Sequence, residues 1–190
     1  MPDGFTHYKG FRAAQHGDFP NVFGPFLEEH KFDIIIEIGT LNGGLTRYLR
    51  DASPSSRIVS YDIRSQPEHP QLIECGIEVK IVNIFGDKEV IDQEALDILK
   101  SKGKKLILCD GGNKAGEFNI LSQYVNSGDF IMGHDYAKSS KYFREYINGK
   151  VWDWLELEDI QISEASTKYG LIEYKPDLFQ SIVWVCKTKN

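Results

Sequence analysis

Short apolar runs alternate with longer stretches of helical spacing along most of this chain. Apolar runs rich in β-branched residues are typical of strands that are buried on both faces of a sheet. Seven strands are predicted, at residues 34–38, 57–61, 78–82, 105–109, 130–132, 152–162 and 180–188. The pattern therefore indicates a sheet whose central strands are covered on both sides.

Apolar residues spaced three and four apart predict helices between these strands. The predicted helices are 45–50, 88–102, 115–125 and 138–147, and Asp18 or Asn21 begins another that ends at His30. The repeated strand–helix order predicts an α/β fold with a doubly wound, mostly parallel seven-stranded sheet. The last two strands are expected to form an antiparallel C-terminal hairpin, joined by a polar loop or substrate flap at 163–179.

A glycine turn joins the first of these strands to its helix. Gly39, Gly43 and Gly44 follow the run 34–38, and such a turn exposes backbone N–H groups at a helix N-terminus to a polar or anionic ligand. Leu41 stands where the dinucleotide fingerprint G-x-G-x-x-G requires glycine, which disfavours a nicotinamide cofactor. A turn that uses glycine only for its geometry is the simpler alternative.

Polar residues or glycine follow nearly every predicted strand, and the carboxyl ends of parallel strands share one edge of a sheet, where ligands bind. These residues are Gly39, Asp62, Asn83, Asp110, His134 and Asp135. Asp62 follows Gly39 at about the 20-residue spacing of an acidic residue that binds ribose hydroxyls. Asp110, His134 and Asp135 offer oxygen and imidazole ligands to a divalent cation such as Mg²⁺. Capping of the next helices is the alternative for the two aspartates.

The pattern E-x-G-x-x-x-G-G, which begins at Glu37, resembles motif I of the class I S-adenosylmethionine (SAM) dependent methyltransferases. The resemblance implies a Rossmann-like methyltransferase domain over residues 1–190, with segment 1–30 as a lid or cover. It also implies SAM as the cofactor. The residues that it assigns to SAM are Glu37, Gly39, Thr40, Gly43, Asp62, Asn83, Ile84 and Asp110.

A narrower resemblance rests on CDGGNKAGEF and NSGDFIMGHDY, which are similar to the branch of cephalosporin hydroxylase-like and macrolide sugar O-methyltransferases. It implies Asp110 and Asp135 as metal ligands, with His134 as a ligand or neighbour. The histidine of that branch's D-x-x-H motif is Asn113 here, so its general base is missing. Lys114 and His134 are the remaining candidates to assist deprotonation of the acceptor.

Composition and charge limit the kinds of partner that this protein can bind. The net charge is −6, which disfavours general nucleic-acid binding, and no apolar run has the length of a membrane span. The absence of an apolar leader and the three scattered cysteines favour a reducing, cytoplasmic location. Trp152, Trp154 and Trp184 are interpreted as core or edge packing rather than as a stacking platform.

The predicted function is divalent-metal-assisted O-methylation of a small molecule by SAM. Metal-independent N-methylation, with Asp110 orienting the amine, is one alternative. A SAM-binding protein without activity is another, and Asn113 is its motivation. The oligomeric state is left open, and a homo-oligomer is one of the alternatives.

Overall fold

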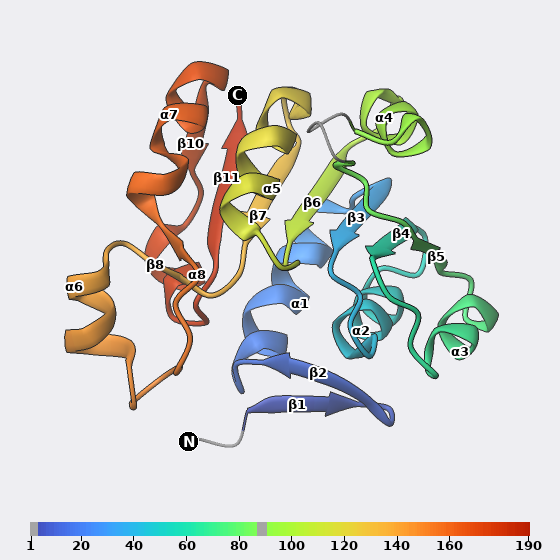
Figure 1. Cartoon of the computed structure of the whole chain (residues 1–190), viewed down its shortest axis with the longest axis horizontal. Helices are drawn as coiled ribbons and strands as arrows, with labels where there is room; N and C mark the ends of the chain where they lie inside the picture. The colour runs from blue at the N-terminus through green and yellow to red at the C-terminus, as the bar shows by residue number, and fades with distance from the viewer. Residues whose placement is uncertain (1–3, 87–90) are drawn as a thin grey trace.

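The computed structural model describes residues 4–86 and 91–190, and its centre is a seven-stranded sheet (Figure 1). The strand order is β10-β11-β7-β6-β3-β4-β5. The strands are β3 (Ile34–Ile38), β4 (Arg57–Asp62), β5 (Glu78–Ile81), β6 (Lys105–Cys109), β7 (Phe130–Gly133), β10 (Leu171–Glu173) and β11 (Val185–Lys189). Within this sheet β11 runs antiparallel to both of its neighbours, and the other pairs are parallel. The predicted fold class is confirmed.

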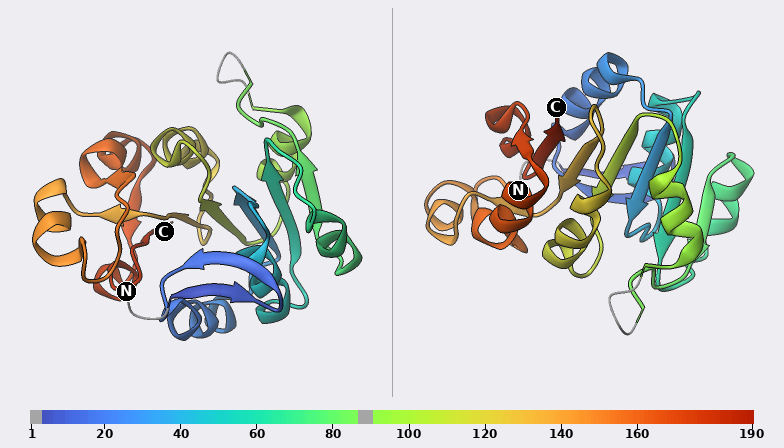
Figure 2. Two further views of the ribbon diagram at one scale, coloured as in Figure 1. Left: turned by 60° about the horizontal axis from the view of Figure 1, so that its bottom comes forward. Right: turned by 90° about the horizontal axis from the view of Figure 1, so that it is seen from above.

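Helices cover both faces of the sheet (Figure 2). On one face lie α1 (Phe19–His30), α2 (Gly44–Ala52), α3 (His69–Glu74) and α8 (Pro176–Gln180). On the other lie α4 (Gln93–Lys100), α5 (Lys114–Leu121) and α7 (Asp159–Tyr169). None of the described helices is both long and apolar enough to span a lipid bilayer.

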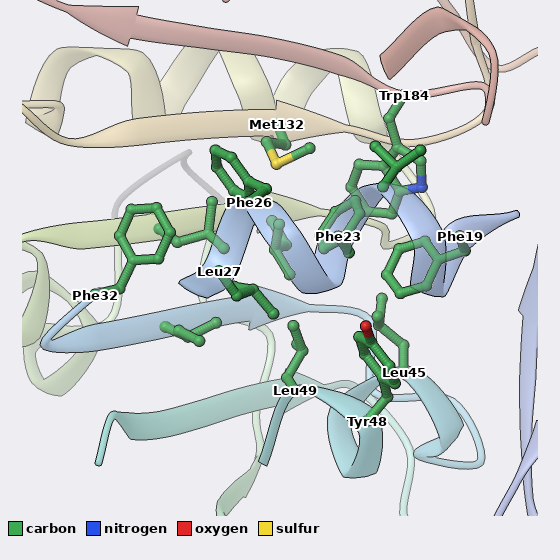
Figure 3. Close-up of a cluster of buried hydrophobic side chains, with 14 of the residues drawn as sticks. Phe19, Phe23, Phe26, Leu27, Phe32, Leu45, Tyr48, Leu49, Met132 and Trp184 are labelled. Carbon is green, nitrogen blue, oxygen red and sulfur yellow. The ribbon is translucent and has the colours of Figure 1, made fainter. Parts of the chain in front are cut away.

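Each face of the sheet has its own hydrophobic core, because successive side chains of a strand point to opposite faces. Ile35 of β3 belongs to the first core, whereas Ile34 and Ile36 belong to the second. Figure 3 shows the first core, in which Phe19 of α1 packs against Tyr48 of α2 and Phe23 of α1 packs against Trp184. These cores hold the strand ends, and hence the candidate site, in a fixed arrangement.

An N-terminal hairpin lies across the carboxyl ends of β3 and β6 (Figures 1 and 2). Its strands, β1 (Phe5–Tyr8) and β2 (Phe11–Gln15), pair antiparallel. The Tyr8 hydroxyl donates a hydrogen bond to Asp51 of α2 at 3.0 Å. A Cβ added to Gly44 would lie 2.5 Å from backbone atoms of Arg12 and Ala13, so α2 and β2 are in direct backbone contact. The sequence pattern did not predict this hairpin.

The prediction of a strand at residues 152–162 is wrong. Only β9 (Leu157–Glu158) is extended there, and it pairs with β8 (Tyr136–Ala137) outside the main sheet. Helix α7 begins at Asp159, where a capping box joins Glu158 to Gln161. This reciprocal cap satisfies backbone donors and favours helix over the extended form that the alternating pattern suggested.

The segment 163–179 is likewise not a loop. It contains most of α7, then β10, and the beginning of α8. The C-terminal hairpin is therefore confirmed, but its first strand is β10, and its second begins at Val185 rather than at residue 180.

Three predicted helices differ from the observed helices at their ends. In the predicted helix 88–102, residues 88–90 lie outside the described residues, and α4 begins at Gln93 after the N-cap Asp92, whose side chain accepts from two backbone N–H groups. The predicted helix 115–125 ends as a 3₁₀ turn, Ser122–Tyr124. The predicted helix 138–147 is α6 (Ser140–Tyr142), continued by a π-helical turn, Phe143–Ile147.

Candidate active site

The glycine turn after β3 packs closely against the end of β6. Gly39 has a φ of +98°, and a Cβ there would collide with the Asp110 carbonyl group. Only glycine combines this backbone conformation with such a close approach. The Gly39 N–H donates to the Tyr61 carbonyl at 2.8 Å, so the turn is also tied to the end of β4.

Asp62 faces this turn, as the ribose-binding interpretation requires. Its Oδ2 accepts a hydrogen bond from the Leu41 N–H at 2.8 Å, and its Oδ1 accepts from the Arg64 N–H at 2.9 Å. Each carboxylate oxygen has a second lone pair that remains available to a hydroxyl group. Asp62 is therefore beside the turn, although it does not line the cavity described below.

Glu37 braces the turn from inside the protein and has no solvent exposure. Its Oε2 accepts from the Thr46 hydroxyl at 2.6 Å and from the Ser60 hydroxyl at 2.5 Å, and Ser60 Oγ lies 2.6 Å from Thr40 Oγ1. Burial raises the pKa of Glu37 to about 8, although the two hydroxyl donors oppose this rise. Its geometry is that of a support for Thr40 and α2 rather than of a group in contact with ligand.

Two other predicted SAM-binding residues, Asn83 and Ile84, do not line the cavity described below. The Asn83 side chain is exposed, and its Oδ1 accepts from the Phe85 N–H at 3.2 Å. Ile84 is buried in the second core, where Ile91 and Tyr61 are also found. In this structure Ile84 is therefore a core residue.

A cluster of charged groups joins the ends of β6 and β7. His134 Nδ1 lies 2.9 Å from Asp110 Oδ1 and 3.7 Å from Asp135 Oδ1. Lys114, at the beginning of α5, brings its Nζ within 3.0 Å of Asp135 Oδ2, 3.8 Å of Asp110 Oδ1 and 2.6 Å of Glu156 Oε2. The structure therefore unites all four residues that were predicted to act in catalysis or to bind metal.

The charges of this cluster are mutually stabilised. Burial disfavours the ammonium form of Lys114, but Asp110, Asp135 and Glu156 outweigh burial and raise the Lys114 pKa. Burial likewise opposes a charge on His134, and the two aspartates again dominate and raise its pKa. Burial disfavours the Asp135 carboxylate, but His134 and Lys114 lower its pKa overall. Lys114 is therefore an ammonium at neutral pH and has no lone pair with which to act as a base.

Side chains that sequence reasoning missed hold these groups in place. The Trp152 indole N–H donates to Asp135 Oδ1 at 2.5 Å, and the buried Gln15 amide donates to Asp110 Oδ2 at 3.0 Å. The Trp184 indole N–H donates to Gln15 Oε1 at 3.0 Å, and its ring stacks on His134. The general need of a buried indole N–H for an acceptor was a usable signal. Nothing in the sequence marked Gln15.

The packing interpretation is confirmed for Trp152 and Trp184, which are buried. Trp154 is 52% exposed and packs edge-on against Trp152, so it is not part of the core.

A cavity of about 260 Å³ opens between the glycine turn, the charged cluster and the N-terminal hairpin. Gly39, Thr40 and Leu41 line one side, Arg12 to Ala14 line another, and the cluster forms the floor. Three lining residues, Ala14, Leu41 and Asp135, have positive φ angles although they are not glycine. Such strained positions concentrate at ligand sites, where the surrounding structure enforces them.

No protein-family model and no curated protein sequence matches the chain. Solved structures do match it. The apo structure of CmcI aligns over 97% of this chain and 76% of its own length, with a TM-score of 0.66 and 16% identity. The MycE methyltransferase from the mycinamycin biosynthetic pathway, in complex with Mg, SAH and mycinamycin VI, aligns over 94% of this chain and 50% of its own, with a TM-score of 0.59 and 16% identity.

The O-methyltransferase NcsB1 from neocarzinostatin biosynthesis, in complex with SAH and a dihydroxynaphthoic acid, aligns over 90% of this chain and 57% of its own, with a TM-score of 0.54 and 12% identity. The chain has a methyltransferase fold. It spans about three quarters of CmcI and about half of MycE and NcsB1. The resemblance seen in the sequence is confirmed at the level of the fold, since identities of 12 to 16% carry no more than that.

The charged cluster of this methyltransferase fold fits a divalent cation. One ligand atom from each of Asp110, His134 and Asp135 lies within 4.8 Å of the other two. The carboxylates of Asp110, Asp135 and Glu156, against the single ammonium of Lys114, leave an excess of two negative charges when His134 is neutral. Carboxylates suit Mg²⁺, and the imidazole also suits Mn²⁺ or Zn²⁺.

Proposed function

We propose that this protein transfers the methyl group of SAM to a hydroxyl oxygen of a small molecule, assisted by a divalent cation. One observation carries the proposal: the glycine turn 39–41 and the cluster of Asp110, Lys114, His134 and Asp135 line the same cavity. This juxtaposition suits methyl transfer, in which a sulfonium donor and an activated oxygen must meet in line. CmcI with Mg and SAM, and MycE with Mg and SAH, have the same fold.

In this proposal the turn at Gly39, Thr40 and Gly43 takes the methionine end of SAM, and Asp62 takes its ribose hydroxyls. Glu37 acts indirectly, because it fixes Thr40 and the first turn of α2 through the hydroxyls of Ser60 and Thr46. Asn83 and Ile84 are given no contact with SAM in this proposal, since Ile84 is buried in the second core and Asn83 does not line the cavity. Asp110 belongs to the floor of the cavity, beside the methyl group.

Asp110, His134 and Asp135 would hold the cation, which lowers the pKa of a bound hydroxyl. The Lys114 ammonium has the same effect on a hydroxyl beside it, because a nearby positive charge favours the oxyanion. The hydroxyl proton is released to solvent, because Asp110 and His134, whose Oδ1 and Nδ1 atoms lie 2.9 Å apart, serve as cation ligands in this proposal. Trp152 and Gln15 keep the two carboxylates oriented through their hydrogen bonds.

The test combines calorimetry with transfer of a labelled methyl group. We expect the protein to bind SAM and to methylate members of a hydroxyl panel, with activity lost in a chelator and restored by Mg²⁺ or Mn²⁺. Asp135→Asn should reduce the cation-dependent rate about 100-fold. Asparagine tolerates the positive φ of 52° at this position, so this variant tests charge rather than backbone conformation.

Three results would contradict the proposal in different ways. Activity that is unaffected by chelator and restricted to amines would indicate metal-independent N-methylation. Tight SAM binding without turnover on hydroxyl or amine panels would indicate a binding protein. Binding of NAD but not of SAM would reject the methyl donor altogether.

A further inference from the structure

A second cavity adjoins the first and differs from it in charge. It has a volume of about 250 Å³ and shares Arg12, Ala14, Trp152 and Trp154 with the first cavity. Three carboxylates, of Asp110, Asp135 and Glu156, line the first cavity. Among the described residues, no carboxylate lines the second. A molecule that extends from one into the other therefore passes from acidic surroundings into positive ones.

Arg12 supplies the positive charge at this boundary. It belongs to β2, its side chain is exposed, and it forms no side-chain hydrogen bond or ion pair within residues 4–86 and 91–190. The other titratable residue of the second cavity is His16, whose pKa is lowered, chiefly by burial, so its ring is neutral near pH 7. A guanidinium in a concave site is well suited to a bidentate contact with a carboxylate.

Trp154 gives the same boundary an aromatic wall. The residue is 52% exposed, and its ring packs edge-on against Trp152, with the ring centroids 5.2 Å apart. Trp152 in turn donates its indole N–H to Asp135. The pair therefore connects the floor of the first cavity to the side of the second. An aromatic acceptor that stacks on Trp154 would reach the charged cluster at one end and Arg12 at the other.

We infer that the methyl acceptor is a hydroxylated aromatic carboxylate. Its hydroxyl lies over Asp110 and Lys114, its ring lies against Trp154, and its carboxylate pairs with Arg12. The inference rests on the proposed methyl transfer and names the substrate class of that same site. The chemistry is ordinary transfer: the hydroxyl proton is lost to solvent, the acceptor oxygen gains the methyl group, and SAM leaves as S-adenosylhomocysteine (SAH).

The experiment uses the full chain with salicylate, protocatechuate and caffeate, each paired with its methyl ester. Acceptor binding is followed by calorimetry in the presence of SAH, and transfer is followed by labelled SAM. We expect the wild type to prefer at least one acid over its ester by about tenfold or more in kcat/KM. Arg12→Gln should bring the acid-to-ester ratio of kcat/KM down to about one, mainly through a higher KM for the acid. Arg12→Lys should retain part of the preference.

Arg144→Gln is the matched control, because it removes the same charge from an exposed arginine that lines neither cavity. It should behave as the wild type. Trp154→Ala should weaken binding of each acid and its ester alike, about tenfold.

The outcomes separate this inference from the function on which it rests. SAM binding without tighter binding of any acid than of its ester overturns the inference and leaves the methyl donor in place. The same holds if Arg12→Gln leaves the acid-to-ester ratio unchanged. Failure to bind SAM overturns the proposed function itself.

Discussion

At the residue scale, a single ammonium group decides how the cluster works. Lys114 was predicted to replace a missing histidine base, since Asn113 occupies that position of the motif. Its Nζ instead contacts three carboxylates and the Gly111 carbonyl, which is the arrangement of a fixed positive charge. Asn113 has a structural role as the N-cap of α5, where its side chain accepts from the Gly116 N–H. A histidine-to-asparagine difference in the motif is therefore compatible with an intact site.

Replacement of Lys114 by methionine should impair both stability and transfer. Three neighbouring carboxylates then lose their counter-charge, which costs about 3–5 kcal/mol for a broken buried pair. We expect kcat to fall about 100-fold, while the affinity for SAM changes much less. Urea unfolding, calorimetry and steady-state kinetics measure the three quantities. Lys141→Met, at an exposed i,i+4 pair with Glu145, is the control and should change none of them.

Glu37 should make stability depend on pH. Its pKa of about 8 lies above its ordinary value, so between about pH 4.5 and 8 the folded protein holds a proton that the unfolded chain has released. The free energy of unfolding should fall by up to about 1.4 kcal/mol per pH unit as the pH rises through this interval. Urea unfolding of the wild type and of Glu37→Gln, which has no charge to titrate, measures the difference. Parallel pH profiles for the two proteins would contradict the assignment.

At the scale of elements, the N-terminal hairpin completes the candidate site. It brings Arg12 and Ala14 to both cavities and Gln15 to Asp110. Its position depends on Gly44, because β2 runs directly over this residue at the first turn of α2. The hairpin and the glycine turn are thus coupled through backbone contact.

Gly44→Ala tests this coupling. The new methyl group would lie 2.5 Å from the backbone of Arg12 and Ala13, so the hairpin must move. We expect a loss of about 1–3 kcal/mol of stability and at least a tenfold loss of transfer. Gly112→Ala is the control, because a Cβ there meets no atom within 4 Å and the φ angle is not in the left-handed region. Unfolding curves and limited proteolysis near the N-terminus distinguish the two variants, and equal behaviour would reject the coupling.

At the scale of the whole molecule, two cores hold the strand ends from both sides of the sheet. A ligand that bridges β3, β6 and β7 should therefore stabilise the entire fold. With SAH at 100 times its dissociation constant, linkage predicts about 2.7 kcal/mol, or a rise in Tm of roughly 5–10 °C. Thermal unfolding with SAH, with Mg²⁺ and with both measures this. An unchanged Tm with SAH would contradict the cofactor assignment.

The sequence by itself determined that the sheet is mostly parallel, that a glycine turn follows its first strand, and that charged residues gather at its carboxyl edge. These features are local: buried β-branched runs, a turn position that tolerates no side chain, and polar residues directly after a strand. Tertiary structure alone decided three features. They are the hairpin over the strand ends, the role of Lys114 as a fixed ammonium, and the edge strand β10 at Leu171–Glu173. Each depends on contacts between segments that are distant in sequence, such as Gln15 with Asp110 and Lys114 with Glu156. No periodicity of the chain encodes those contacts.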